Sequence, residues 1–438
     1  MRPIKPVKTR IAARLTVATL LAVSGGAAAA TAATGALAST AAGSLTPVAR
    51  YALVDLTNFT PKGYNTPVPV AINSSGMVVG EVFSGGTPTA SGSTGLAAPA
   101  LPSNLQKAVA GTTAVPHVFI FANDQFTVLP TGPATKQAWV RGLNDADAFT
   151  VATCTRQDCD HYFVVNSVLQ GAKRSYSWAP LQSANLGIDG LGPIAENGDV
   201  TGAIGNPYYA VAVVWHLKRG GYSLPVALGS DPHAGHFARA YIPLTISSAS
   251  GQDLVGGIEA TPAFYPDGSP ALWGPKFAHD FGWIGSETIA MAAEGKTTLA
   301  TVGCPLPIPA CAPSCPINAL VDTISVVNGV PAVKASLKLA NPPKSTPHCG
   351  VSPLALTVDP AGRPFTVGLE GLLGAHQYLP EAVIWVGAHI ETLNNLIPTP
   401  HTNLQWAVGV NSAGQIIGTG TIGGLKDSAY LLTPTATW

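Results

Sequence analysis

Short apolar runs separated by turns rich in Gly and Asn recur along most of the chain. Near one end, two such runs flank Asn-Ser-Ser-Gly at residues 73–76. Near the other end, two similar runs flank Asn-Ser-Ala-Gly at residues 411–414. Because Asn and Gly tolerate a positive φ, each segment predicts a β-hairpin between two short strands.

Weaker copies of this hairpin lie between the two. The copy at residues 194–202 fits well, whereas the copy at residues 143–151 keeps the Asn and has Asp147 in place of the Gly. The turn positions are 44 to 71 residues apart and lie at Gly76, Asp147, Gly198, Gly251, Gly295, Gly362 and Gly414. This spacing fits a repeated unit of about 45–50 residues with loop insertions, which is close to the size of a propeller blade.

Each unit has a second half that begins with an apolar, often aromatic run. These runs lie at residues 118–121, 162–165, 212–215, 271–273, 319–321, 382–385 and 429–432. A short fourth strand follows, as at residues 126–129. Four short strands per unit, rich in Val, Ile, Thr and aromatic residues, predict an all-β fold: a seven-bladed β-propeller of four-stranded blades.

The two ends of the repeat region complement each other. The seventh unit has no fourth strand after its aromatic run, and residues 51–56 have the pattern of a fourth strand without a unit of its own. We expect this N-terminal strand to pair with the last unit and close the ring, which removes both open sheet edges. The alternative is an irregular pair of β-sandwiches with chance similarities between segments.

Residues 1–38 have the form of an export signal. An apolar, Ala-rich stretch begins at Leu15 and ends in a cleavage-site pattern at residues 36–38, with residues 27–29 as an alternative. The basic residues before it are Arg2, Lys5, Lys8, Arg10 and Arg14. A retained membrane anchor is the other interpretation, which the Gly25-Gly26 break disfavours. We therefore predict a secreted protein with a signal peptide (1–38), a linker (39–49), a propeller (50–438) and no transmembrane segment after signal removal.

Charge narrows the class of partner. Only 11% of residues are charged, and removal of the signal leaves 18 basic against 23 acidic residues, a net charge of −5. A mildly acidic, charge-poor surface argues against nucleic acid and anionic lipid as partners. The 47 Gly and 38 Pro residues suit the many turns of an all-β repeat fold.

All six cysteines follow the signal. They are Cys154, Cys159, Cys304, Cys311, Cys315 and Cys349. An even number in an exported chain predicts disulfide bonds, with Cys154 paired to Cys159 and two further bridges among the other four. The alternative is a metal site that joins these four cysteines with His348, but the spacing lacks a C-x-x-C pair and export favours oxidation.

The repeats resemble a known family. Residues 51–56, 71–73 and 76–80, together with the later Ala-x-x-Trp runs, are similar to the HAF-repeat extracellular proteins. The resemblance covers most of residues 50–438, although the second unit lacks the turn Gly and the fifth lacks the aromatic residue. It implies an extracellular, repeat-built protein and supplies no catalytic residues.

The longest connections fall between the second and third strands of the units, at residues 84–116, 154–159, 260–270, 304–316 and 371–380. In a propeller these connections open at one end of the molecule, and such long-loop ends often bind partners. Aromatic and polar residues there suit a glycan or a peptide. The candidates are Tyr208, Tyr209, His233, His236, His376 and Tyr378. For each, a solvated loop residue is the simpler interpretation, and two histidines alone make no metal site.

Enzyme motifs are missing from the sequence. There is no G-x-S-x-G, no H-E-x-x-H, no P-loop and no G-x-G-x-x-G before a helix. Four carboxylates lie near the long-loop end, with nothing in the sequence to pair them, namely Glu259, Asp267, Glu370 and Glu381.

We therefore expect a secreted or surface-associated monomer that acts as an extracellular binding module, without catalysis, cofactor or metal. Its expected partner is a glycan or an extracellular protein. The alternatives are a carbohydrate-active or lactonase-like propeller enzyme that uses the same end, and a structural envelope protein without a soluble ligand.

Overall fold

The chain forms an all-β propeller, seen in a computed structural model. The structure describes residues 50–65, 67–85, 115–130, 137–154, 159–171, 173–181, 191–206, 209–227, 240–249, 253–260, 269–274, 277–280, 287–294, 297–303, 319–327, 330–340, 351–373, 378–397 and 399–436. They belong to one compact unit, Val48–Trp438, and the predicted signal peptide and linker lie outside them. The described part of the chain contains no helix with the length and hydropathy of a membrane span.

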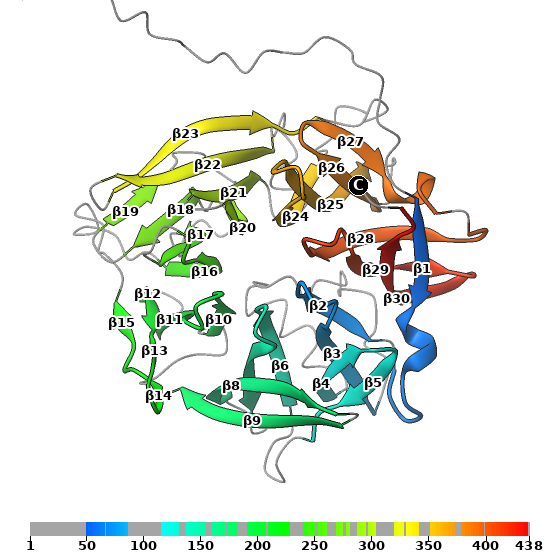
Figure 1. Ribbon diagram of the computed structural model, residues 1–438, viewed down its shortest axis with the longest axis horizontal. Coiled ribbons are helices and arrows are strands. Elements are labelled where there is room, and N and C mark those ends of the chain that lie inside the picture. Colours follow the sequence, from blue (N-terminus) through cyan, green and yellow to red (C-terminus); the bar gives the residue numbers. More distant parts are fainter. Residues whose placement is uncertain are drawn as a thin grey trace, which may run out of the picture. The chain divides into compact units, whose positions relative to one another are not determined.

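Five sheets have four strands each, and sequential strands within each sheet pair antiparallel. They are β2 (Val68–Ile72), β3 (Val78–Ser84), β4 (Val115–Ala122) and β5 (Gln125–Val128); β6 (Gln137–Leu143), β7 (Ala148–Cys154), β8 (Cys159–Gln170) and β9 (Lys173–Leu181); β20 (Glu287–Glu294), β21 (Thr297–Gly303), β22 (Leu320–Val327) and β23 (Val330–Lys338); β24 (Val351–Val358), β25 (Pro364–Leu373), β26 (Tyr378–Val386) and β27 (His389–Thr392); and β28 (Asn403–Val410), β29 (Ile416–Ile422), β30 (Leu425–Pro434) and β1 (Tyr51–Asp55). Figure 1 shows the sheets around a common axis, with the first strand of each sequential set nearest to it.

The third and fourth predicted units form one eight-stranded sheet. Its strands are β10 (Leu191–Ile194), β11 (Val200–Asn206), β12 (Tyr209–Trp215), β15 (Val226–Ala227), β16 (Ala240–Ser247), β17 (Leu254–Ala260), β18 (Ser269–Gly274) and β19 (Phe277–Asp280). The two halves meet where β12 and β16 pair in parallel at Ala210 and Ala240. The described residues therefore form six large sheets, where the sequence predicted seven separate blades. A small hairpin, β13 (Leu217–Lys218) and β14 (Gly221–Tyr222), follows β12.

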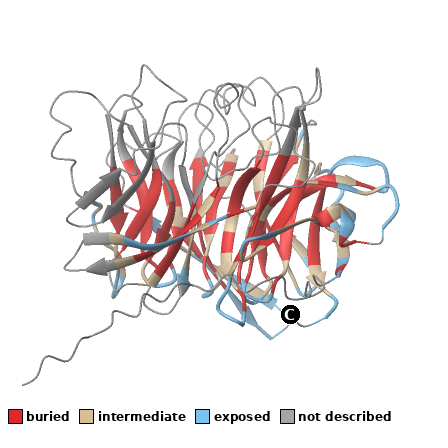
Figure 2. Ribbon diagram, turned by 90° about the horizontal axis from the view of Figure 1, so that it is seen from above, coloured by how far each residue is buried: buried red, intermediate tan, exposed pale blue. Residues whose placement is uncertain are grey.

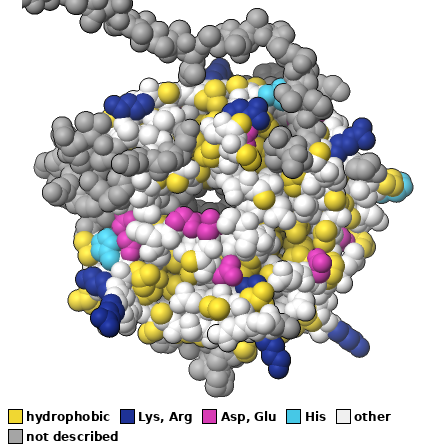
Figure 3. Space-filling view, viewed as in Figure 1, with side chains coloured by type: hydrophobic (Ala, Val, Ile, Leu, Met, Phe, Trp, Pro, Cys, Tyr) yellow, Lys and Arg dark blue, Asp and Glu magenta, His cyan; other side chains and the backbone are white. Residues whose placement is uncertain are grey.

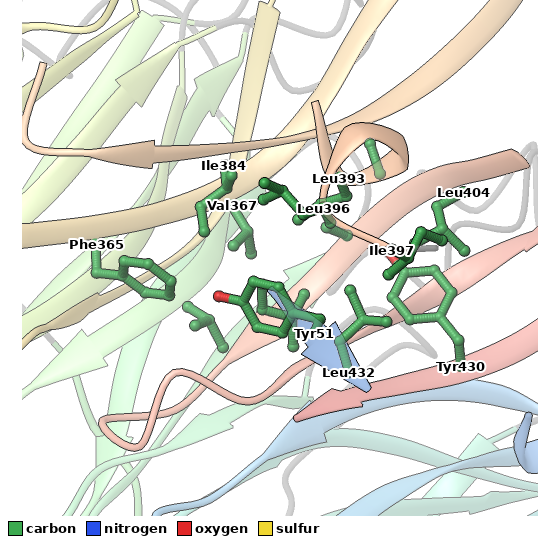
Figure 4. Packing of buried hydrophobic residues seen from close by; sticks show 14 of the residues in the cluster. Tyr51, Phe365, Val367, Ile384, Leu393, Leu396, Ile397, Leu404, Tyr430 and Leu432 are labelled. Atoms are coloured by element: carbon green, nitrogen blue, oxygen red, sulfur yellow. The ribbon is translucent and has the colours of Figure 1, made fainter. Parts of the chain in front are cut away.

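The first strand lies against the last. β1 pairs antiparallel with β30, with Tyr51 opposite Pro434 and Asp55 opposite Tyr430. Figure 4 shows the ring of Tyr51 among apolar side chains from β25, β26, β28 and β30. Two 3₁₀ turns border this region, η1 (Leu56–Phe59) and η5 (Leu393–Asn395). The expected pairing of the N-terminal strand with the last aromatic run is thus present.

The predicted hairpin turns are confirmed where the structure describes them. Gly76, Gly198, Gly362 and Gly414 have φ between 75° and 89°, a region that favours Gly. Asp147 takes the same place in the second unit with a φ of 60°, which Asp tolerates better than most residues. The turns predicted at Gly251 and Gly295 lie outside the described residues. We call the end of the molecule that carries these turns the turn end, and the opposite end the long-loop end.

A second repeated glycine sits inside the second strand of several units. Gly80, Gly368 and Gly418 each lie so close to the first strand that a Cβ atom there would collide with a backbone carbonyl. The carbonyls belong to Val68, Ser352 and Trp406, respectively. The register of the first strand shifts close to each contact, so a bulge brings its backbone against the glycine.

Apolar clusters fill the spaces between neighbouring sheets. The largest fully buried side chains include Phe119, Phe149, Trp215, Trp385 and Tyr430, and a buried aromatic residue of this kind removes about 150–250 Å² from water. Figure 2 shows buried positions running through the strands and exposed positions in turns and at edges. Apolar side chains thus join each sheet to its neighbours where the structure describes them.

Candidate functional site

The structure locates only two of the six predicted ligand contacts. Tyr209 is the first residue of β12 and Tyr378 the first of β26, so both begin strands and are not loop residues as expected. Their side chains lie outside the described part of the structure. The other four candidates, Tyr208, His233, His236 and His376, also lie outside it.

Two of the six cysteines have described backbones. Cys154 ends β7, Cys159 begins β8, and the two are register partners. Antiparallel partners have Cα atoms about 4.5–5.5 Å apart, which lies within the range of a disulfide bond. The backbone is therefore compatible with the predicted bridge. The other four cysteines, Cys304, Cys311, Cys315 and Cys349, lie outside the described residues.

The sixth unit contains a carboxyl pair that the sequence did not reveal. The connection predicted at residues 371–380 is shorter than expected, because β25 extends to Leu373 and β26 starts at Tyr378. This extension places Glu370 of β25 directly opposite Glu381 of β26. Since the first strand of this unit begins with Val351 beside Glu370, the pair lies towards the long-loop end.

The environment of Glu370 favours its neutral form. Glu370 is only 6% exposed. Burial, and then the charge of Glu381 and a hydrogen bond to it, together raise its pKa to about 7. Among the described residues, Glu370 Oε2 has no hydrogen-bond partner. At neutral pH this carboxyl can therefore both donate and accept a hydrogen bond, and the described residues leave one of its oxygens without a partner.

The side chain of Glu381 is bound by a hydrogen-bond network that connects it to the neighbouring sheet. Asn394, in the 3₁₀ turn η5, donates from Nδ2 to Glu381 Oε1 at 3.0 Å. The same amide contacts Asn403 Oδ1 at 3.1 Å, and its oxygen accepts from Leu404 N at 2.7 Å, both on β28. The carboxyl pair thus sits next to the junction of the β24–β27 and β28–β30 sheets, in a fixed polar network.

A second cluster lies at the turn end, where no functional residues were expected. Asp199 follows the turn between β10 and β11, His216 follows β12, and Asp253 precedes β17. One donor atom from each lies within 4.8 Å of the others. His216 Nδ1 is 3.1 Å from Asp199 Oδ2 and 3.4 Å from Asp253 Oδ2.

Both carboxylates of this cluster are buried and oriented by other groups. Asp199 Oδ1 accepts from the backbone N of Leu217 at 2.6 Å, and Asp253 Oδ1 accepts from Asn197 Nδ2 at 3.3 Å. Burial and then the negative charge of Asp199 raise the pKa of Asp253, while His216 opposes this effect. Burial and Asp199 also raise the pKa of Tyr222 to about 12, and its hydroxyl donates to Gly198 O at 3.0 Å.

A sequence signal for this cluster exists in the repeats. Asp199 and Asp253 stand at nearly the same turn position in successive units, where other units have Met77, Arg363 or Gln415. His216 comes directly after the aromatic run of the third unit. Figure 3 shows one face of the molecule with an opening near its centre, acidic side chains to the left of and below the opening, and a histidine beside acidic side chains at the left of the view.

Comparison with known proteins assigns no function to these sites. No family model and no curated protein matches the sequence. Among solved structures, the chain is similar to a sialidase from Trypanosoma rangeli (TM-score 0.42, 9% identity, 87% of this chain and 59% of that one). It is also similar to a gluconolactonase from Xanthomonas campestris (TM-score 0.35, 12% identity, 88% and 91%) and to a lectin from Aleuria aurantia (TM-score 0.32, 10% identity, 76% and 96%). The chain spans about three fifths of the length of the sialidase.

Proposed function

We propose that the protein is an exported extracellular binding module that takes a hydroxyl-rich ligand, a glycan, at its long-loop end without turnover. The observation that carries this proposal is the Glu370–Glu381 pair, in which a buried carboxyl oxygen has no partner among the described residues. Leaving a buried polar atom unpaired costs about 1–3 kcal/mol. Such an oxygen is expected where a ligand supplies the missing hydrogen bond.

The chemistry near the pair suits sugar hydroxyls. A neutral carboxyl at Glu370 can donate or accept, and a hydroxyl needs both kinds of partner. Tyr378 begins the strand that carries Glu381, and His376 belongs to the connection just before it. An aromatic ring next to hydrogen-bonding groups is a common arrangement in ligand sites.

The spacing of the pair argues against hydrolysis by two carboxylates. Glycosidases hold their two carboxyl groups about 5 Å or more apart, whereas Glu370 and Glu381 are hydrogen bonded to each other. A carbohydrate-active or lactonase-like enzyme is the second candidate. The observation that favours it is the pKa of Glu370 of about 7, which suits a general acid at neutral pH.

The proposal includes a seven-bladed ring closed by β1. The eight-stranded sheet has one parallel pair, at Ala210 and Ala240, and dividing it there gives β10–β12 with β15 and β16–β19. Together with β1 on β30, each of the seven units then has four strands. A closed ring leaves no open sheet edge between units and gives the binding end a rigid support.

Export and disulfide bonding are supported by the sequence. Residues 1–38 have the basic, apolar and small-residue segments of a signal peptide, and the repeats resemble the HAF-repeat extracellular proteins. The facing backbones of Cys154 and Cys159 agree with an oxidising environment.

The test is a glycan array probed with the mature chain, residues 39–438, followed by affinity measurement for each glycan that binds. The variants are Glu370→Gln, which replaces the ionisable group with one of similar shape, and Tyr208→Ala/Tyr209→Ala. The matched control is Glu391→Gln on β27, a partly exposed carboxylate whose described hydrogen bond is to Asn395. We expect Glu370→Gln to weaken binding about tenfold, because a hydrogen bond to a buried group is lost or reversed.

Three results contradict the proposal. Binding that is equally strong in Glu370→Gln and Glu391→Gln excludes the carboxyl pair as the site. If no glycan binds and a pull-down captures a protein, the partner is a protein and not a glycan. Hydrolysis of any glycan on the array, lost in Glu370→Gln, establishes the enzyme in place of the binding module.

A further inference from the structure

The donor atoms of Asp199, His216 and Asp253 have the separations of a coordination shell. The Nδ1 atom of His216 lies 3.1 Å from one carboxylate oxygen and 3.4 Å from the other. Ligands that surround a Zn²⁺ ion tetrahedrally at about 2.0–2.2 Å stand about 3.3 Å from one another. The two distances from the imidazole nitrogen match this value, and the donor atoms of the three residues all lie within 4.8 Å of one another. The side chain of His216 is 38% exposed, so the cluster can be reached from solvent.

The carboxylates are held so that one oxygen of each turns to the imidazole. The other oxygens accept from Leu217 N on Asp199 and from Asn197 Nδ2 on Asp253, and the same Asn197 amide donates to Asp199 Oδ2 at 2.9 Å. Hydrogen bonds of this kind, from groups outside the coordination shell, orient the ligands of known metal sites. Two buried carboxylates in contact repel each other, and among the described residues their only ion-pair partner is His216.

At the turn end, hydrogen bonds from side-chain amides connect some of the successive units. At three junctions the turn Asn donates from Nδ2 to the turn carbonyl of the next unit: Asn411 to Asn73, Asn73 to Asn144, and Asn144 to Ala195. The series stops at Ala195, which has no amide to reach the fourth unit. The junction that follows Ala195 carries Asp199, His216 and Asp253. Two carboxylates face each other here, and the groups that bridge them are the Asn197 amide and the His216 imidazole.

We propose that Asp199, His216 and Asp253 bind a divalent transition-metal cation, of which Zn²⁺ is the best fit, and that this ion ties the β10–β12 half of the eight-stranded sheet to the β16–β19 half. Two carboxylate oxygens and one imidazole nitrogen are the mixed ligand set of Zn²⁺ and its neighbours. Ca²⁺ requires six to eight oxygen ligands and Mg²⁺ an octahedral oxygen shell, so neither is expected to bind strongly. The inference is independent of the proposed glycan site, which lies at the other end of the sheets.

The test measures Zn²⁺ binding to the untagged mature chain. The protein is stripped with a chelator, its free thiols are alkylated so that they cannot bind the metal, and Zn²⁺ is titrated by calorimetry, with Ca²⁺ and Mg²⁺ in parallel. The variants are Asp253→Asn and His216→Gln. The control is His389→Gln, which removes an exposed imidazole on β27 far from the cluster in sequence.

We expect one Zn²⁺ per chain, a higher melting temperature with Zn²⁺, and affinity at least about tenfold weaker in Asp253→Asn and His216→Gln but unchanged in His389→Gln. Asp253→Asn removes a buried negative charge without changing shape, so it should fold and test binding directly. No saturable binding of Zn²⁺, or equal affinity in Asp253→Asn and His389→Gln, overturns the proposal. Failure of this test leaves the glycan result unaffected, and the reverse also holds.

Discussion

At the scale of single residues, the turn asparagine has two tasks. Its Oδ1 accepts backbone N–H groups inside its own turn, as Asn144 does from Ala146 and Ala148 at 3.1 and 3.0 Å. Its Nδ2 reaches the next unit, as Asn411 does to Asn73 O at 2.8 Å. Asp359 fills the same position in the sixth unit without an amide, and there Arg363 lies 2.7 Å from its second oxygen. The repeated Asn therefore joins units as well as shaping turns.

Replacing Asn144 by Asp separates the two tasks. Asp keeps the acceptor for the turn but cannot donate to Ala195 O, now 3.1 Å from the amide. It also buries a charge beside that carbonyl. We expect Asn144→Asp to lower the free energy of unfolding by about 1–3 kcal/mol in denaturant titrations at pH 7. Asn166→Asp, at an exposed position of β8, is the control and should change it by less than about 0.5 kcal/mol. Equal losses in the two variants contradict the role of the amide.

Glu81 gives the molecule a pH dependence that can be measured. Burial raises the pKa of this β3 carboxyl from 4.5 to about 7, and the charge of Arg141 and the N–H of Val140 offset part of the effect. Between these two pH values the native state keeps a proton that the unfolded chain has lost. The free energy of unfolding therefore falls as pH rises from about 4.5 to about 7, by at most about 3 kcal/mol from Glu81, and Glu370 acts in the same direction.

Unfolding titrations at several pH values check this dependence. Glu81→Gln does not titrate, so its stability should fall less over this window than that of the unmodified chain. Glu391→Gln is the control and should keep the full slope. A slope that is the same in both variants refutes the assignment to Glu81.

Single residues also mark the limit of what the sequence could predict. The turn residues Gly76 and Asn73 were recognisable because their conformational preferences are local. The pairing of Glu370 with Glu381 depends on the register of β25 and β26, and a shift by one residue would separate them. Asp199, His216 and Asp253 come from three segments that only the sheet brings together, so no local pattern could join them.

At the scale of elements, the hairpins are the part of the structure that the sequence predicted best. The alternation of apolar runs and turns predicted the apolar third strand of each unit, and the seven runs fall in strands except for Ala319, which directly precedes β22. The sequence underestimated strand length at the long-loop end, as at β25 and β26, because Gly371 and Pro380 indicated a loop although they are paired within the two strands. The hairpin of β8 and β9 is also long. Its residue Arg174 donates hydrogen bonds to Asp147 Oδ2 at 3.2 Å and to Ser167 Oγ at 2.9 Å.

The β7–β8 connection provides a prediction at this scale. If Cys154 and Cys159 are bridged, the bond closes a small loop and stabilises the native state by about 2 kcal/mol. We expect Cys154→Ser to lower the free energy of unfolding by this amount and to expose one additional reactive thiol in denaturant. A reducing agent should remove the difference in stability from the unmodified chain. Reactive thiols at both positions in the unmodified, exported protein exclude the bridge.

At the scale of the whole molecule, the apolar clusters continue from sheet to sheet. The cluster around Tyr51 joins residues of the β24–β27 sheet to β28 and β30, and a second cluster joins β29 and β30 to the first unit through Leu56 and Phe119. The first and last parts of the chain thus share two clusters. The prediction of seven equal blades missed the pairing of β12 with β16, because a single contact between two units leaves no pattern in either.

The proposed closure of the ring by β1 predicts that the N-terminal strand stabilises all the sheets together. Deleting residues 39–58 removes β1, leaves the backbone of β30 unpaired on one side, and opens both clusters. We expect the truncated chain to unfold at a markedly lower temperature, in one transition that includes all sheets.

Because such a chain can fail to fold, Leu56→Ala is the milder variant. It should lower the free energy of unfolding by about 2–5 kcal/mol in denaturant titrations, because Leu56 is fully buried. Leu425→Ala, at a side chain 62% exposed, is the control and should cost less than about 0.5 kcal/mol. A truncated chain that melts like the full one, or equal losses in the two Leu variants, shows that the ring does not depend on this strand.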